Sequence, residues 1–252
     1  MTGHEYLTAL LTKQRVRQED LAPLQQARQQ IENDLRRVYG AAPRFYYAGS
    51  YGKGTLIRAS FDLDLVIYFP PESGTSLRDL FNGVHGTLLG AGYVVEPKTV
   101  ALRLPYEGGF HVDVVPGRAQ DATYRYATLF KNTQPQSTLQ TSLKVHIDAV
   151  RKSGLADVVK LLKLWRLRHK VPLQTIALEI LVARALAGQR NDDLAAATWR
   201  VFQYVQQHIA QARLQDPANT NNVIEVSSGD RLLAAQYASA TLARRNWSEI
   251  VW

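Results

Sequence analysis

Residues 49–64 read GSYGKGTLIRASFDLD, and residues 110–117 read FHVDVVPG. The first segment joins a glycine-rich turn to two aspartates that stand two positions apart, and the second segment contributes a further aspartate. This layout is typical of a metal-dependent site for nucleotidyl transfer. The prediction holds only if the two segments form neighbouring strands beside the turn.

Hydrophobic alternation supports both strands. From Phe61 to Phe69 every second residue is apolar, as in a strand that packs one face on a core. Asp62 and Asp64 therefore share the other face, with backbones roughly 6.5–7 Å apart at ~3.3 Å per residue. Residues 110–115 alternate in the same way and place Asp113 on one face. If this second strand pairs beside the first, Asp113 reaches the same place as the other two aspartates.

Three carboxylates gathered in this way repel one another. At an effective dielectric near 20, two charges ~4 Å apart interact by about 4 kcal/mol. A divalent cation removes this repulsion, and oxygen ligands suit Mg²⁺ or Mn²⁺. Two ions roughly 3.5–4 Å apart can stabilise both the attacking and the leaving oxygen of a phosphoryl displacement. We therefore expect two Mg²⁺ or Mn²⁺ ions at Asp62, Asp64 and Asp113.

The glycine-rich turn predicts a place for phosphates. Its glycines allow a close approach of the backbone, whose amides can cradle phosphate oxygens. These glycines are Gly49, Gly52 and Gly54. Ser50 adds a hydroxyl group, and Lys53 and Arg58 add positive charge. We expect residues 55–60 to form a short helix whose N-terminus faces the phosphates.

Each part of the pattern has an ordinary structural interpretation when it is taken alone. An Asp-X-Asp pair on a strand is usually a solvated face, and Gly-Ser-Tyr-Gly is usually a turn. Their combination with Asp113 favours a metal site. His111 lies on the same face as Asp113, and we interpret it as a hydrogen-bonded structural histidine rather than a metal ligand.

Residues 49–64 and 112–116 resemble the DNA polymerase β superfamily of nucleotidyltransferases. More narrowly, they are similar to the branch that holds 2′-5′ oligoadenylate synthetases, cyclic GMP-AMP synthase and the bacterial CD-NTases. Residues 161–165, which read LLKLW, resemble the lysine-X-tryptophan helix of that branch. Residues 173–181, which read LQTIALEIL, resemble its next helix, and residues 216–222 resemble its late Asp-Pro motif.

This resemblance implies an α+β, bilobed nucleotidyltransferase fold. A mixed β-sheet core would be flanked by helices, a C-terminal helical lobe would follow, and a long N-terminal helix would brace both. Residues 1–150 would form the catalytic core with its N-terminal brace, and residues 151–252 the helical lobe that completes the donor-nucleotide site. The pattern over residues 4–38 itself predicts one long helix kinked near residues 20–23, or two shorter helices.

The resemblance also implies roles for the residues of the catalytic core. Asp62 and Asp64 would bind both metal ions, and Asp113 would complete the ion nearest the attacking hydroxyl. Gly49 and Ser50 would contact the donor phosphates.

Further contacts to the donor are implied in the helical lobe. Lys163 would reach the triphosphate tail, where Thr175 could add a hydroxyl group. Lys160 lies three residues before Lys163 and shares its helix face, so we expect at least one of them to contact the triphosphate. Ile176 stands where several relatives carry a tyrosine that stacks on the donor base, so no base preference is carried over.

Composition is that of an intracellular enzyme. The chain has 252 residues, no cysteine and a formal net charge of +8. The lack of cysteine excludes disulfides, thiolate zinc sites and cysteine nucleophiles. The sequence has no long apolar run and begins with polar residues, so we expect a cytoplasmic protein without a membrane partner. The positive charge suits NTP phosphates and also an RNA ligand or activator, whereas no oligomeric state is indicated.

The leading hypothesis is an enzyme that uses NTPs, ATP among them, to make linear or cyclic oligonucleotide second messengers with release of pyrophosphate. The resemblance places such enzymes in antiphage defence. Three alternatives stay open. One is a nucleotidyltransferase that extends RNA or tRNA 3′ ends, as the CCA-adding enzymes do. The others are a catalytically inactive sensor of nucleotide or RNA, and an enzyme that transfers AMP to a protein.

Overall fold

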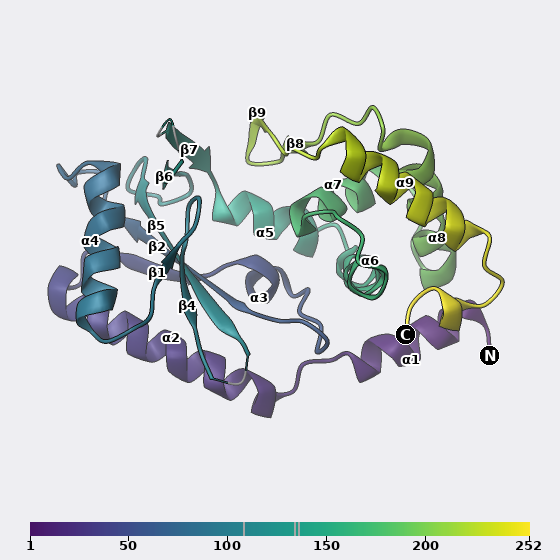
Figure 1. The fold of residues 1–252 in the computed structure, drawn as a ribbon, viewed down its shortest axis with the longest axis horizontal. Coiled ribbons are helices and arrows are strands. Elements are labelled where there is room, and N and C mark those ends of the chain that lie inside the picture. Colours follow the sequence, from purple (N-terminus) through teal and green to yellow (C-terminus); the bar gives the residue numbers. More distant parts are fainter. Residues whose placement is uncertain (108, 134, 136) are drawn as a thin grey trace. The chain divides into compact units, whose positions relative to one another are not determined.

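A computed structural model describes residues 1–107, 109–133, 135 and 137–252. Contacts divide the chain into two compact units (Figure 1). The sheet unit comprises Val16–Lys53 and Phe61–Ile147, and the helical unit comprises Met1–Arg15, Gly54–Ser60 and Asp148–Trp252. Helices combined with a mixed sheet confirm the expected fold class. The functional division at residue 150 stays a prediction.

The N-terminal region forms two helices, which was one of the two alternatives. Helix α1 (Gly3–Lys13) belongs to the helical unit and α2 (Gln18–Tyr39) to the sheet unit. The break between them is at residues 14–17, so the kink expected near residues 20–23 is wrong. Pro23 lies inside α2, where it removes the backbone hydrogen bond to the Glu19 carbonyl without ending the helix.

One mixed sheet organises the sheet unit (Figure 1). Its central path runs in the order β1-β2-β5-β4-β3, with β6 pairing with β5 and β7 with β6. β2 and β5 are parallel, and the other pairs are antiparallel. The strands are β1 (Arg44–Tyr47), β2 (Leu63–Phe69), β3 (Glu96–Pro97), β4 (Leu102–Pro105), β5 (His111–Ala119), β6 (Ala127–Lys131) and β7 (Ser137–Thr141). Gly108, in the turn expected before β5, lies outside the described residues.

The two faces of β2 are both covered over most of its length. Alternate residues of β2 and β5, such as Leu65 and Val114, share a core with α2 and with α4 (Leu77–Gly90). On the opposite face, Val66 and Tyr68 pack with residues of β6. The predicted alternation is therefore confirmed. Asp64 stands on the face opposite α2 and α4, at the beginning of β2.

The glycine-rich turn itself is helical. Helix α3 (Gly49–Lys53) covers it, and the helix expected over residues 55–60 is wrong: there the chain makes only an isolated bridge between Ile57 and Ser60. Gly54 explains the difference, because its φ of +72° is a left-handed conformation that commonly ends a helix.

The helical unit packs around Trp165. Its indole is fully buried, donates a hydrogen bond from Nε1 to Thr241 Oγ1 at 2.9 Å, and contacts the Phe202 ring. The later elements are α5 (Leu143–Arg151), α6 (Ala156–His169), α7 (Thr175–Ala185), α8 (Leu194–His208), β8 (Gln215–Asp216), β9 (Asn219–Val223), α9 (Ser228–Leu242) and a final 3₁₀ turn, η1 (Trp247–Glu249). Within the described ranges, no helix has the length and apolar character needed to cross a membrane.

The Asp-Pro motif is a structural turn. Asp216 is buried and accepts hydrogen bonds from the Ala218 backbone N–H at 2.7 Å and from Asn222 Nδ2 at 3.0 Å. These bonds close the β8–β9 hairpin, as expected for residues that favour turns.

Candidate active site

The parallel pairing of β2 and β5 sets two aspartates side by side. Asp64 and Asp113 are direct partners in the strand register. Asp62 lies just before β2, where its side chain is more exposed (39%) than that of Asp113 (17%). The expected strand pairing is thus confirmed, and the three carboxylates gather at one end of the two strands.

Gly49 permits the contact between the turn and Asp64. A Cβ atom at Gly49 would overlap the Oδ2 atom of Asp64, and the φ of Gly49 is +49°. The backbone N–H of Ala48 also donates to the Asp64 carbonyl at 2.9 Å. The glycine-rich turn and the acidic strand are therefore fixed against each other, as a site for phosphates and cations requires.

Burial and negative charge act together on Asp64. Desolvation is the larger cause and the Asp113 carboxylate the next, and together they raise the pKa of Asp64 to about 6. Lys53 acts in the opposite direction and lowers this pKa. Lys53 is itself buried at the end of α3, and its charge offsets part of the repulsion at Asp64.

His111 lies between two of the carboxylates. Its Nδ1 atom is 2.9 Å from Asp62 Oδ1, and its Nε2 atom is 3.6 Å from Asp113 Oδ2. This geometry agrees with the interpretation of His111 as a hydrogen-bonded structural histidine.

Arg103 is a member of the site that sequence reasoning missed. It is the register partner of Asp113 on β4, and it donates from Nε to Oδ1 and from Nη2 to Oδ2, both at 2.9 Å. The signal for it was present, because Leu102 and Leu104 flank it in an apolar–polar–apolar alternation. That pattern alone predicts an outward-facing residue, but not its partner.

The donor set suits a hard divalent cation. Carboxylate oxygens are the ligands that Mg²⁺ and Mn²⁺ prefer, and burial together with the charge of Asp113 raises the pKa of Asp64. Across the described part of the chain, no three His, Cys, Asp or Glu side chains are already arranged around a metal position. At Asp113, both carboxylate oxygens accept hydrogen bonds from Arg103.

The aromatic ring nearest the turn is a packing residue. Tyr51 stacks on Tyr47 with ring centroids 4.2 Å apart, and its hydroxyl accepts a hydrogen bond from Gln25 Nε2 at 3.3 Å. These contacts make Tyr51 a packed aromatic residue of the sheet unit.

Three of the predicted nucleotide contacts belong to the helical unit. Lys163 is buried, and its Nζ donates to the Thr55 carbonyl at 3.0 Å. Lys160 pairs with Asp157 at 2.9 Å, and the Thr175 hydroxyl accepts from Arg166 Nη1 at 3.0 Å. The structure thus gathers Gly49, Ser50, Lys53 and the three aspartates in the sheet unit, and leaves Lys160, Lys163 and Thr175 in the other.

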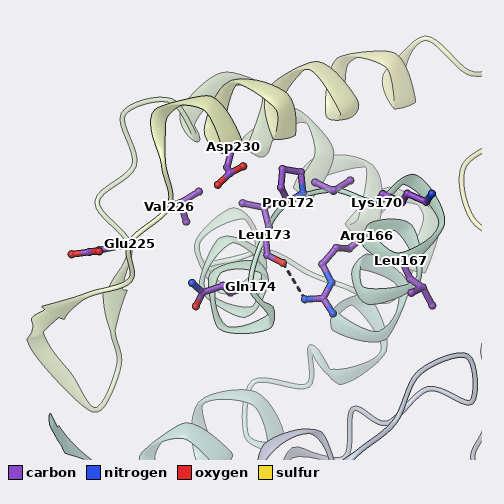
Figure 2. A pocket seen from close by; sticks show the side chains of 10 residues that line it. Arg166, Leu167, Lys170, Pro172, Leu173, Gln174, Glu225, Val226 and Asp230 are labelled. Carbon is purple, nitrogen blue, oxygen red and sulfur yellow. Dashed lines mark hydrogen bonds between the residues drawn. The ribbon is translucent and has the colours of Figure 1, made fainter. Parts of the chain in front are cut away.

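The helical unit contains a cavity of about 460 Å³. Figure 2 shows the side chains that line it. The lining comes from the end of α6, the segment that follows it, the segment before α9 and the start of α9. The residues are Arg166, Leu167, Lys170, Val171, Pro172, Leu173, Gln174, Glu225, Val226 and Asp230. Arg166 donates from Nη1 to the Leu173 carbonyl, and burial lowers its pKa. Lys160, Lys163 and Thr175 are not part of this lining.

Comparison with solved structures identifies the fold. CdnC of E. coli MS115-1, in complex with HORMA-deltaN, matches with a TM-score of 0.75 at 20% sequence identity, over 94% of this chain and 89% of that chain. The CD-NTase CdnG of Bradyrhizobium diazoefficiens, in complex with GTP, matches with a TM-score of 0.73 at 13% identity, over 94% and 88% of the two chains. The chain has the nucleotidyltransferase fold. Cid1 poly(U) polymerase shares it, with a TM-score of 0.70 at 12% identity over 95% and 93%.

The comparisons confirm the resemblance to CD-NTases at the level of the fold. No protein-family model matches the sequence, and no curated protein matches it. Within the nucleotidyltransferase fold, the roles of the aspartates, the glycine-rich turn and the lysines stay predictions.

The first prediction concerns Gly49. Gly49→Ala and Gly54→Ala both place alanine at positive φ, which costs about 1–2 kcal/mol, but only Gly49→Ala also displaces Asp64. We expect Gly49→Ala to lower the free energy of unfolding by at least ~1 kcal/mol more, measured by urea titration. In a protein that also carries Asp64→Ala, the difference between the losses caused by Gly49→Ala and Gly54→Ala should be smaller, because the Asp64 side chain is gone. Equal losses in the two glycine variants would contradict the close packing of Gly49 on Asp64.

The second prediction concerns pH. In the metal-free protein the raised pKa of Asp64 disfavours its ionised form, so the penalty on folding grows from pH 3.8 to about 6 and is constant above. Asp64→Asn should therefore raise the stability by about 1–3 kcal/mol above pH 6 and by little near pH 4. Thermal melts in EDTA across this range measure it, with the exposed Asp192→Asn as control. A variant that melts lower at pH 8 would indicate a structural need for the charge.

Proposed function

We propose that this chain is a metal-dependent nucleotidyltransferase that transfers a nucleoside monophosphate from an NTP to a hydroxyl group and releases pyrophosphate. The observation that carries the proposal is the register pairing of Asp64 with Asp113, beside Asp62 and the Gly49 turn. The nucleotidyltransferase fold supports it.

The sheet unit supplies the proposed chemistry. Asp62, Asp64 and Asp113 would hold two Mg²⁺ or Mn²⁺ ions, which would neutralise the carboxylates and stabilise the attacking and leaving oxygens. The oxygen of the acceptor hydroxyl forms a bond to the α-phosphorus of the NTP. At the same time the bond from the α-phosphorus to the oxygen that links it to the β-phosphorus breaks, and pyrophosphate leaves with this oxygen. The Asp113 carboxylate is the proposed acceptor of the hydroxyl proton. Gly49 and Ser50 would bind the donor phosphates.

Positive side chains are the proposed contacts of the triphosphate. Lys53 is close enough to Asp64 to influence its pKa. In the helical unit, Lys160 is the easier residue to redirect, because a partly exposed i,i+3 pair with Asp157 is worth only about 0.2–1 kcal/mol. Lys163 would have to give up a buried hydrogen bond to the Thr55 carbonyl. Thr175 would contribute its hydroxyl group.

The proposed products are linear or cyclic oligonucleotide second messengers. Support comes from the neighbours that are CD-NTases, among them a cyclic dinucleotide synthase of Elizabethkingia meningoseptica. ATP would be one of the substrates, and antiphage defence the setting that the resemblance implies.

A second candidate is an enzyme that extends RNA ends. The match to Cid1 poly(U) polymerase supports it, because its TM-score of 0.70 is similar to those of the CD-NTases. The net charge of +8 also suits an RNA ligand. An inactive sensor is disfavoured, because a protein that only binds nucleotide or RNA does not need two carboxylates side by side at Asp64 and Asp113.

The third prediction tests this function. Purified protein with Mg²⁺ or Mn²⁺ and the four NTPs should release pyrophosphate and yield phosphatase-resistant oligonucleotides in mass spectrometry. Combined Asp62→Asn and Asp64→Asn should abolish the products with the circular dichroism unchanged. Combined Asp192→Asn and Glu249→Gln removes the same charge from exposed positions and should leave activity intact.

The alternatives give different results in the same assay. Products that appear only when RNA is added, with label on the RNA, would favour the RNA-extending enzyme. Label on a polypeptide would favour AMP transfer to protein. NTP binding without turnover under all of these conditions would contradict the proposed reaction and favour a sensor.

A further inference from the structure

The strongest unassigned feature of the acidic cluster is the guanidinium group of Arg103. It donates one hydrogen bond to each oxygen of Asp113, both at 2.9 Å, in the bidentate geometry that is the strongest for this pair. The Asp113 side chain is 17% exposed and that of Arg103 36%. Asp113 is therefore held firmly, while the arginine side chain has access to solvent.

The backbone fixes which residue meets Asp113. Arg103 and Asp113 are register partners on antiparallel strands β4 and β5. Leu102 and Leu104, on either side of Arg103, are fully buried in the core on the opposite face. A shift of one residue would bury Arg103 and expose both leucines. The pairing of Arg103 with Asp113 is thus as strongly specified as the core itself.

Asp113 lies between one positive and one negative neighbour. β4 brings Arg103 from one side, and β2 brings Asp64 from the other. In the absence of a cation, Arg103 supplies the positive charge that lets Asp113 stay beside Asp64. A divalent ion bound to Asp113 would supply this positive charge instead of Arg103, because the ion and the guanidinium compete for the same carboxylate.

We propose that Arg103 is a positioning residue that holds Asp113 in the metal-free site and weakens the binding of a divalent cation there until nucleotide arrives. This inference rests on the proposed function, which assigns Asp113 to the metal ions. A triphosphate would bring both the cation and a new partner for the guanidinium, since arginine pairs bidentately with phosphate as well as with carboxylate. Metal and nucleotide would then bind together more readily than metal alone.

The fourth prediction is a metal titration without nucleotide. Free Mn²⁺ is followed by electron paramagnetic resonance in the wild-type protein, in Arg103→Gln and in Arg118→Gln. Arg118 is the control, because it lies on β5, the strand of Asp113, but donates to the Ser73 and Thr75 carbonyls. We expect Arg103→Gln to bind Mn²⁺ at least about fivefold more tightly than the wild type. Arg118→Gln should bind Mn²⁺ with the affinity of the wild type.

Further readouts separate positioning from a merely structural role. In EDTA, Arg103→Gln should melt at a lower temperature than the wild type, and Mn²⁺ should raise its melting temperature by more. Arg103→Lys keeps the charge but loses the bidentate geometry, so its Mn²⁺ affinity should be intermediate. Asp64→Asn should abolish the tight binding. Circular dichroism of each variant checks that it is folded.

The outcomes distinguish this inference from the proposed function. Equal or weaker Mn²⁺ binding by folded Arg103→Gln would overturn it, whether or not NTPs are turned over. Mn²⁺ binding that survives Asp64→Asn would also overturn it, because the ion would then lie elsewhere. Tighter binding by Arg103→Gln in a protein that turns over no NTP would support the role of Arg103 while the proposed reaction fails.

Discussion

The parallel pairing of β2 with β5 is the constraint on which the candidate site depends. It makes Asp64 and Asp113 register partners. The residues on either side of each aspartate are apolar and pack into a core shared with α2 and α4. Moving either strand by one residue would exchange acidic and apolar positions, so hydrophobic burial maintains the proximity of the two carboxylates. Much of the free energy that gathers these like charges therefore comes from the core and not from the site.

Positive groups of the chain itself moderate the resulting repulsion. Arg103 pairs with both oxygens of Asp113, and the charge of Lys53 lowers the pKa of Asp64. At Asp64, burial and the charge of Asp113 outweigh this compensation, and its pKa stays raised at about 6. A site that gathers three acids and buries one of them is suited to attract cations, which is the physical basis for the proposed nucleotidyl transfer.

Regular hydrophobic alternation made the central strands and the position of Asp113 predictable from the sequence. Local conformation was harder: the helix at the turn covers Gly49–Lys53 and not residues 55–60, because the left-handed Gly54 ends it. The break after α1 was also misplaced, since Pro23 is tolerated inside α2. Arg103 was missed for another reason. Its partner depends on the register of β4 against β5, which a short strand does not reveal without three-dimensional pairing.

The most direct test is a crystal structure with Mn²⁺ and a non-hydrolysable ATP analogue, in which anomalous scattering locates the metal. The account predicts Mn²⁺ bound by carboxylate oxygens of Asp62, Asp64 and Asp113, with the triphosphate against the turn at Gly49 and Ser50. Mn²⁺ and nucleotide bound elsewhere, with Asp113 still paired to Arg103 through both oxygens, would contradict it.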